Sequence, residues 1–238
     1  MEQDVFIGGF KPASMLERPG LISGVLFTVG CNLRCPFCHN PELVTDSKEV
    51  PPYPVQEILD TLFEKKNWID SVVFTGGEPT LHKGLYGLMR LIKNEGFQVG
   101  LHTNGTNPTT LEKLLADGLL SYVAMDIKAS KEKYPLATGR KNLSFAPIAK
   151  SIKLIQSVPR GVATIFRTTV VPGIVEAADI RKIGKMIEGA NEASLQQFRT
   201  MKCINRVFEK RKPYDVDQLH EMADELEKYV TRVEREFI

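Results

Sequence analysis

Short apolar runs alternate along the chain with longer segments in which apolar residues recur every three to four positions. The run at 21–29 is rich in β-branched and aromatic residues and predicts a strand. In the segment at 54–66, Ile58, Leu59 and Leu62 share one face, which predicts a helix. The same alternation predicts further strands at 71–75, 98–103, 121–128, 162–171 and 193–198, and helices at 85–96, 109–118, 145–157 and 177–189.

Strands followed by helices predict parallel βαβ units with right-handed crossovers, and hence an α/β fold. The strands are apolar almost throughout, as expected where helices cover a sheet. Periodicity alone allows either a partial barrel or an open doubly wound sheet. In both architectures, ligands bind at the C-terminal ends of the strands.

The last segment, 215–236, reads as one long amphipathic helix that packs on the body of the domain. We therefore predict a single domain over 1–238, with a core at about 20–200, a basic segment at 199–213 and this C-terminal helix. The helix's apolar stripe comprises Val216, Leu219, Met222, Ala223, Leu226, Tyr229, Val230 and Val233.

Composition sets limits on partners and compartment. The chain has 238 residues and a net charge of +2, which is too small to indicate nucleic-acid binding. We see no signal peptide at the N-terminus and no apolar run long enough to span a membrane, so we expect a cytoplasmic protein. Thiols are kept reduced there, which favours metal-ligating or catalytic cysteines over disulfides.

Polar residues follow the apolar runs at the point where each strand is expected to end. In parallel strands these positions converge on one site. They are Cys31, Cys35 and Cys38 after the first strand, Gly76, Gly77, Glu78 and Pro79 after the second, His102, Thr103, Asn104 and Gly105 at the third, Asp126 and Lys128 at the fourth, and Arg167 on the fifth.

Three of the four cysteines lie in the spacing C-x3-C-x2-C. A lone nucleophile leaves the triplet unexplained, while structural zinc needs a fourth ligand, such as His39 or Cys203. A [4Fe–4S] cluster held by three thiolates fits best, because it leaves one iron open for a small molecule. Zinc remains the alternative at this point.

The stretch CNLRCPFC, followed by TGGEP, resembles the cluster loop of the radical S-adenosylmethionine superfamily. The motifs ERPG, CHNPEL, HTNG, MDIKAS, YPLATG and RTTVVPG resemble the subgroup that activates glycyl-radical proteins, nearest to the activases of anaerobic ribonucleoside-triphosphate reductase. The resemblance implies a partial (β/α)6 TIM-type barrel, with S-adenosylmethionine chelating the open iron.

The resemblance also implies roles for individual residues. Related activases often have aspartate at the position of His102, where it helps hold a monovalent cation, so His102 puts such a cation near Asp126 in doubt. The implied cluster ligands are Cys31, Cys35 and Cys38, and the implied S-adenosylmethionine contacts are Phe37, Gly76, Gly77, Glu78, Thr103, Asn104, Asp126, Lys128, Arg167 and Phe198.

The implied function is reductive cleavage of S-adenosylmethionine to a 5′-deoxyadenosyl radical, which takes a hydrogen atom from a glycine of the anaerobic reductase. A ferredoxin or flavodoxin type of protein supplies the electron. The alternatives are a small-molecule substrate of deazapurine or pterin type, an RNA substrate, or a non-enzymatic zinc-bound module that contacts nucleic acid. We expect Cys203 to be a buried inert thiol, and the basic segment to be either a solvated loop or a docking surface.

Overall fold

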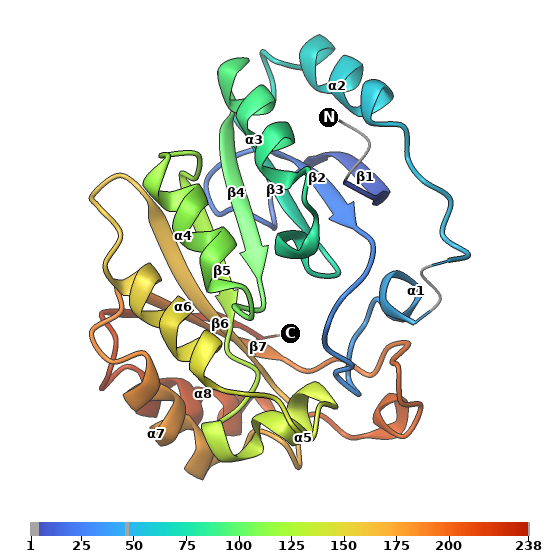
Figure 1. Ribbon diagram of the computed structural model, residues 1–238. Coiled ribbons are helices and arrows are strands. Elements are labelled where there is room, and N and C mark those ends of the chain that lie inside the picture. Colours follow the sequence, from blue (N-terminus) through green and yellow to red (C-terminus); the bar gives the residue numbers. More distant parts are fainter. Residues whose placement is uncertain (1–4, 46–47, 238) are drawn as a thin grey trace.

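The centre of the protein is one eight-stranded sheet (Figure 1), in a computed structural model that describes residues 5–45 and 48–237. The strands follow one another across the sheet in chain order; β1 is antiparallel to β2, and β2 to β8 are parallel. The strands are β1 Ile7–Ser14, β2 Ser23–Thr28, β3 Ser71–Gly76, β4 Gln98–Thr103, β5 Tyr122–Asp126, β6 Ala163–Val170, β7 Glu192–Gln197 and β8 Arg232–Glu236.

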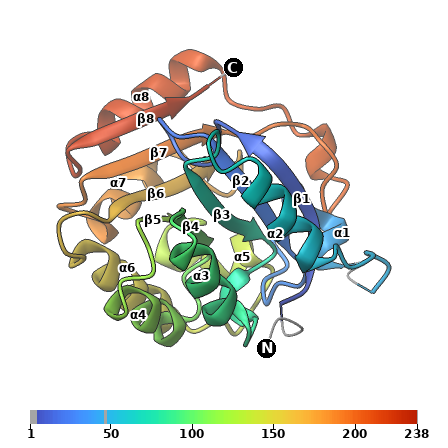
Figure 2. The same ribbon diagram turned by 90° about the horizontal axis from the view of Figure 1, so that it is seen from above.

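The strand order decides between the two predicted architectures. In a doubly wound sheet the order of the strands reverses at a switch point, whereas here the strand order runs from β1 to β8 without such a reversal. The helices cover the outside of a curved sheet (Figure 2), so the fold is a partial barrel, and the six predicted strands are β2 to β7. The helices are α1 Pro41–Val44, α2 Val55–Glu64, α3 Leu85–Asn94, α4 Pro108–Ala116, α5 Tyr134–Thr138, α6 Ala146–Gln156, α7 Ala177–Met186 and α8 Val216–Leu226.

The covering helices form where the sequence places one apolar face toward the strands. In α3, Leu85, Leu88, Met89 and Ile92 are spaced by three or four residues, and all four are buried. No helix in the described ranges combines the length and apolarity needed to cross a membrane.

The predicted C-terminal helix over 215–236 is wrong in its second half. Helix α8 begins at a capping box formed by Asp215 and Gln218 and ends at Leu226. The chain then turns, and β8 adds a parallel edge strand to β7. Val233 is the one apolar residue of Arg-Val-Glu-Arg-Glu and is buried, and the ladder of this segment with β7 outweighs the weak helical stripe.

Candidate functional site

A cavity of about 270 Å³ lies at the C-terminal ends of the parallel strands. It gathers every predicted site residue except Phe198. A larger hollow of about 510 Å³ between α7 and α8 is lined by helix-surface side chains such as Arg181 and Glu225, so we place the site at the smaller cavity. Its predicted lining residues are Cys31, Phe37, Cys35, Cys38, Gly76, Gly77, Glu78, Thr103, Asn104, Asp126, Lys128 and Arg167.

The three cysteines lie on the cluster loop, residues 29–40, which follows β2. Three distant segments hold this loop through backbone hydrogen bonds. Glu78 N donates to Gly30 O at 2.8 Å, Arg34 N donates to Thr138 O at 2.8 Å, and Asn205 N donates to Pro36 O at 2.9 Å. The loop is therefore fixed by β3, by α5 and by the segment after β7.

Two glycines let these segments approach the loop closely. A Cβ at Gly77 would overlap the carbonyl oxygen of Gly30, and one at Gly139 would overlap that of Arg34. Gly139 also has a φ of +64°, which favours glycine. The glycines of TGGEP and YPLATG thus bring backbone against the cluster loop, a role beyond the ligand approach predicted for Gly76 and Gly77.

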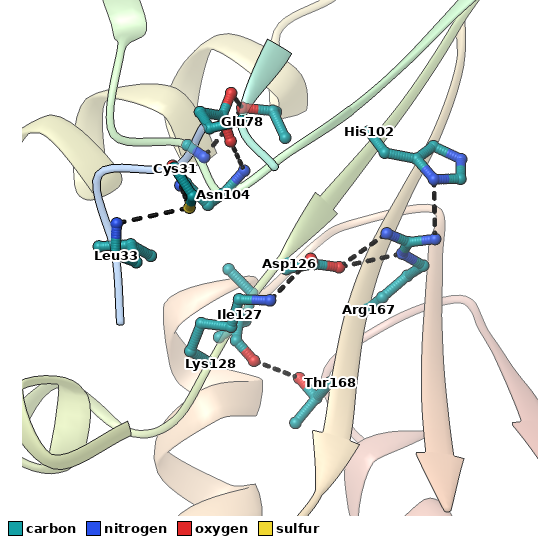
Figure 3. Close-up of polar contacts among 12 residues, drawn as sticks. Cys31, Leu33, Glu78, His102, Asn104, Asp126, Ile127, Lys128, Arg167 and Thr168 are labelled. Carbon is teal, nitrogen blue, oxygen red and sulfur yellow. Dashed lines mark hydrogen bonds and ion pairs between the residues drawn. The ribbon is translucent and has the colours of Figure 1, made fainter. Parts of the chain in front are cut away.

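Cys31, Cys35 and Cys38 are free thiols that face one cavity. Burial raises the pKa of Cys31, and it raises that of Cys35 to about 12. Cys31 Sγ accepts hydrogen bonds from Leu33 N at 3.4 Å and Asn104 Nδ2 at 3.8 Å (Figure 3). The described residues contain no group of three or more His, Cys, Asp or Glu side chains placed to hold a single metal ion. Three thiols on one loop fit a cluster, in which each thiolate binds its own iron.

Glu78 is fully buried, and its carboxylate joins the ends of β3 and β4. Oε1 accepts hydrogen bonds from Thr80 Oγ1 at 2.6 Å and Thr103 Oγ1 at 2.8 Å, and Oε2 accepts one from Asn104 N at 2.7 Å. Burial raises the pKa of Glu78, although these hydrogen bonds act in the opposite direction. This carboxylate holds the cavity wall together in addition to lining it.

A second set of polar side chains lines the cavity at the ends of β4, β5 and β6, and hydrogen bonds and ion pairs connect its members (Figure 3). Asp126 lies directly opposite Arg167 in the strand register. Its Oδ1 accepts from Arg167 Nε at 3.1 Å and Nη2 at 2.9 Å, and its Oδ2 accepts from Lys128 Nζ at 2.8 Å. Asp126 and Lys128, two residues apart, therefore lie on one face, and Arg167 is ion-paired with Asp126.

His102 completes this group as a neutral side chain. Its Nε2 lies 2.8 Å from Glu17 O, a carbonyl that only accepts, so Nε2 carries the proton. Nδ1 then accepts from Arg167 Nη1 at 3.2 Å. Burial, together with the Arg167 charge, lowers the pKa of His102 to about 3. The ERPG motif thus supplies the carbonyl that fixes the tautomer of His102.

The side chains of this set carry a net positive charge. Burial acts to raise the pKa of Asp126, but Arg167 and Lys128 outweigh it and hold that pKa well below its usual range. Burial acts to lower the pKa of Lys128, and the Asp126 charge instead raises it. One carboxylate facing two cations leaves a net positive wall, which suits a ligand carboxylate.

The implied monovalent cation does not fit this arrangement. Both oxygens of Asp126 face cationic nitrogens, and His102 offers no oxygen ligand and has both ring nitrogens engaged. Thr103 Oγ1 is hydrogen-bonded to Glu78. Alkali cations bind oxygen ligands, and here the Arg167 guanidinium takes their place beside Asp126.

Phe198 lies beneath the cavity wall. It is buried, and its ring stacks on His39 with centroids 5.7 Å apart, while His39 itself lines the cavity. Phe198 also meets Phe208 edge-on at 6.5 Å. The structure thus places the predicted adenine contact one layer behind the surface that a ligand would touch.

Several residues in or beside the cavity were not singled out from the sequence. Asn32 does not line the cavity, but it bridges the cluster loop to the β4 loop: its Oδ1 accepts from Asn104 Nδ2 at 3.0 Å, and its Nδ2 donates to Thr106 Oγ1 at 2.8 Å. Thr169 and Gln196, which pair in the β6–β7 register, line the cavity. Thr169 is two residues beyond Arg167, so strand alternation was the available signal.

Comparisons with known proteins agree with this geometry. A family model described as "Radical SAM superfamily" matches residues 25–186. The protein named "Putative glycyl-radical enzyme activating enzyme" of Methanocaldococcus jannaschii is 32% identical over 232 residues, covering 95% of this chain and 94% of the relative. The pyruvate formate-lyase-activating enzyme of Clostridium pasteurianum is 29% identical over 236 residues, covering 90% and 94%.

Among solved structures, Streptococcus suis SuiB bound to precursor peptide SuiA superposes with a TM-score of 0.66 at 17% identity. The match covers 88% of this chain and 47% of that one. At this identity the likeness shows the fold alone, and it agrees with the partial barrel read from the strand order.

Proposed function

The chain belongs to the radical SAM superfamily, and from this premise we propose that it activates a glycyl-radical enzyme. Enzymes of this superfamily use a [4Fe–4S] cluster and S-adenosylmethionine, which together supply a 5′-deoxyadenosyl radical. The observation that carries the proposal is the single cavity shared by three free thiols and a network of opposite charges. Membership in an enzyme superfamily argues against the zinc-bound, non-enzymatic module.

The residues of this chain have distinct proposed tasks. Cys31, Cys35 and Cys38 hold the cluster. Phe37, which is buried, lines the cavity and directly precedes Cys38 in the sequence, shields the cluster from water. Arg167 and Lys128 bind the ligand carboxylate, and Asp126 orients both. The backbone after β3 binds the ligand ammonium, with Glu78 behind it. None of these tasks needs a general acid or base.

The partner is proposed on sequence resemblance. We name anaerobic ribonucleoside-triphosphate reductase, whose activases the motifs resemble. Pyruvate formate-lyase is the second candidate, because a relative covering nearly the whole chain is named as its activating enzyme. We place the protein in the cytoplasm, where the four free cysteines stay reduced.

The decisive experiment compares two cysteine variants after anaerobic reconstitution. Cys31→Ala should lose iron and cleavage of S-adenosylmethionine together, whereas Cys203→Ala should keep both, since Cys203 lines no part of the cavity. Low-temperature EPR of the reduced wild-type protein should change on addition of S-adenosylmethionine. Full activity in Cys31→Ala would reject the cluster assignment.

The substrate is tested with the same preparation. Incubation with each candidate glycyl-radical protein should give a glycyl-radical EPR signal in one of them. Cleavage of S-adenosylmethionine with no radical in either protein would favour the small-molecule or RNA alternative.

A further inference from the structure

The basic segment, residues 199–213, packs against the cluster loop yet lies outside the cavity. None of the cavity-lining residues belongs to this segment. Besides the bond from Asn205 N to Pro36 O, its Arg199 carbonyl lies 3.0 Å from His39 Nε2. In Figure 1 the orange chain after β7 runs beside the blue loop after β2. A partner can therefore reach the cluster loop here without entering the cavity.

The segment presents positive charge that the fold does not use. The structure describes all of this segment. In it, Arg199, Arg206, Lys210 and Lys212 are exposed, and their side chains make no hydrogen bond or ion pair with another described residue. The one acidic side chain, Glu209, is turned inward, where its Oε1 accepts a hydrogen bond from Cys203 N at 3.1 Å. Four cationic side chains are thus available to an acidic partner.

A short stack of packed side chains joins this surface to the cluster loop. Val207 is 64% exposed, and the neighbouring Phe208 is only 7% exposed. The Phe208 ring lies 6.4 Å from that of Phe37, centroid to centroid, and Phe37 directly precedes Cys38. A protein docked on the segment is therefore separated from the cysteines by about two side-chain layers.

We propose that the basic segment docks an acidic electron-transfer protein of the flavodoxin or ferredoxin class. In its reduced form this partner gives one electron to the cluster held by Cys31, Cys35 and Cys38, and is itself oxidised by one electron. The need for this electron rests on the proposed function. A glycine substrate must reach the cavity where the radical forms, whereas an electron donor only needs proximity to the cluster loop, which is what this segment offers.

The test uses two charge-reversal variants of the full chain. The first combines Arg199→Glu, Arg206→Glu and Lys210→Glu. The control combines Lys65→Glu, Lys153→Glu and Arg160→Glu, three exposed residues near the opposite ends of the strands. Each variant changes the net charge by the same amount, so a general charge effect appears equally in both.

Binding is measured first, by calorimetry with an oxidised flavodoxin and an oxidised ferredoxin at low and moderate salt. Both the metal-free chain and the reconstituted protein are titrated. The basic-segment variant should bind the better of the two probes at least about tenfold more weakly and with a smaller salt dependence, as expected for electrostatic docking. The control variant should bind like wild type. Equal weakening in both variants, or no binding of either probe to wild type, would overturn the proposal.

Turnover is then compared with two reductants and no glycyl-radical protein. Cleavage of S-adenosylmethionine by the basic-segment variant should slow with the reduced protein donor and stay unchanged with dithionite, which needs no docking. Equal slowing with both reductants would contradict the proposal. So would unchanged donor-driven cleavage in the basic-segment variant. If a separate titration then showed weaker binding of the glycyl-radical protein, the segment would be assigned to substrate docking. Wild type that cleaves nothing with dithionite would reject the proposed function, while the binding comparison would still test the docking.

Discussion

His102 holds a charged neighbour in place without carrying charge itself. The Glu17 carbonyl fixes its proton on Nε2, and Nδ1 is then left as an acceptor for the Arg167 guanidinium. A protonated imidazole would lose this acceptor and would repel Arg167. The side chain thus works as a neutral support for the guanidinium that faces the cavity.

The neutral state of His102 makes stability depend on pH. Its pKa is about 3 in the folded chain, against roughly 6.5 in the unfolded chain. Between these values only the unfolded chain binds the proton, so the free energy of unfolding falls as the pH falls from 6.5, by about 2 kcal/mol at pH 5. Urea unfolding of His102→Gln under reducing conditions should lose less stability between pH 7 and pH 5 than wild type. Equal losses in the two proteins would show that His102 is not the responsible group.

The paired oxygens of Asp126 predict activity without alkali cations. Rates of S-adenosylmethionine cleavage should be the same in potassium, sodium and choline chloride at equal ionic strength, because Arg167 and Lys128 already neutralise this carboxylate. His102→Asp removes the acceptor of Arg167 and adds carboxylate oxygens, so this variant should cleave faster in potassium than in choline. A wild-type enzyme that fails in choline would contradict this reading of the site.

At the scale of elements, two backbone hydrogen bonds and a glycine join the end of β3 closely to the end of β2 and the cluster loop. Gly77 N donates to Thr28 O, and the next residue donates to Gly30 O, both at 2.8 Å. No side chain fits between these backbones. The position of the cluster loop therefore depends on a glycine one strand away.

Gly77→Ala tests this dependence. The added methyl group meets the Gly30 carbonyl, so we expect a stability loss of about 1–3 kcal/mol and a lower iron content after reconstitution. Gly87→Ala is the matched control, because α3 leaves open space there and alanine favours a helix by up to ~1 kcal/mol. Thermal unfolding and iron analysis of both variants decide the point. Normal iron content in Gly77→Ala would mean that the loop tolerates displacement.

The elements that the sequence predicted are those with strong local patterns. Strands β2 to β5 are buried on both faces for most of their length, β6 and β7 keep a shorter buried apolar stretch, and the helices between the strands are amphipathic. These patterns made the inner strands predictable, whereas the edge strands lack them. β1 contains Gly8, Gly9 and Pro12, which disfavour strands, and β8 continued an apparent helical stripe. Propensity there was overridden by pairing with a neighbour.

The location of the site was predictable from the sequence, but the contacts within it were not. Strand ends located the cavity residues because parallel strands share one end. The contact of His102 with Arg167 depends on how β4, β5 and β6 align, and the bridge through Asn32 depends on two loops meeting. Neither relation has a local pattern, so neither could be read before the fold was known.

At the scale of the molecule, the cavity joins strands that are far apart in the chain. A ligand that touches residues from the cluster loop to β6 binds the folded chain and has no counterpart in the unfolded one. Binding therefore stabilises the whole barrel by mass action.

This coupling predicts a thermal shift. S-adenosylmethionine at about a hundred times its Kd should stabilise the reconstituted protein by about 2.7 kcal/mol. For a chain of this size that corresponds to roughly 5–10 °C in Tm. Anaerobic fluorescence-detected melting checks this, with Arg167→Ala expected to shift less. The same shift in Cys31→Ala as in wild type would mean that the ligand does not need the open iron.

The three segments that hold the cluster loop also determine when, during synthesis, the loop can take its final position. The loop's own residues leave the ribosome early, but its hydrogen-bond partners Glu78, Thr138 and Asn205 follow later. The loop therefore has all three of its supports only after the segment at 199–213 has been synthesised. We accordingly expect the cluster to be assembled on the completed barrel.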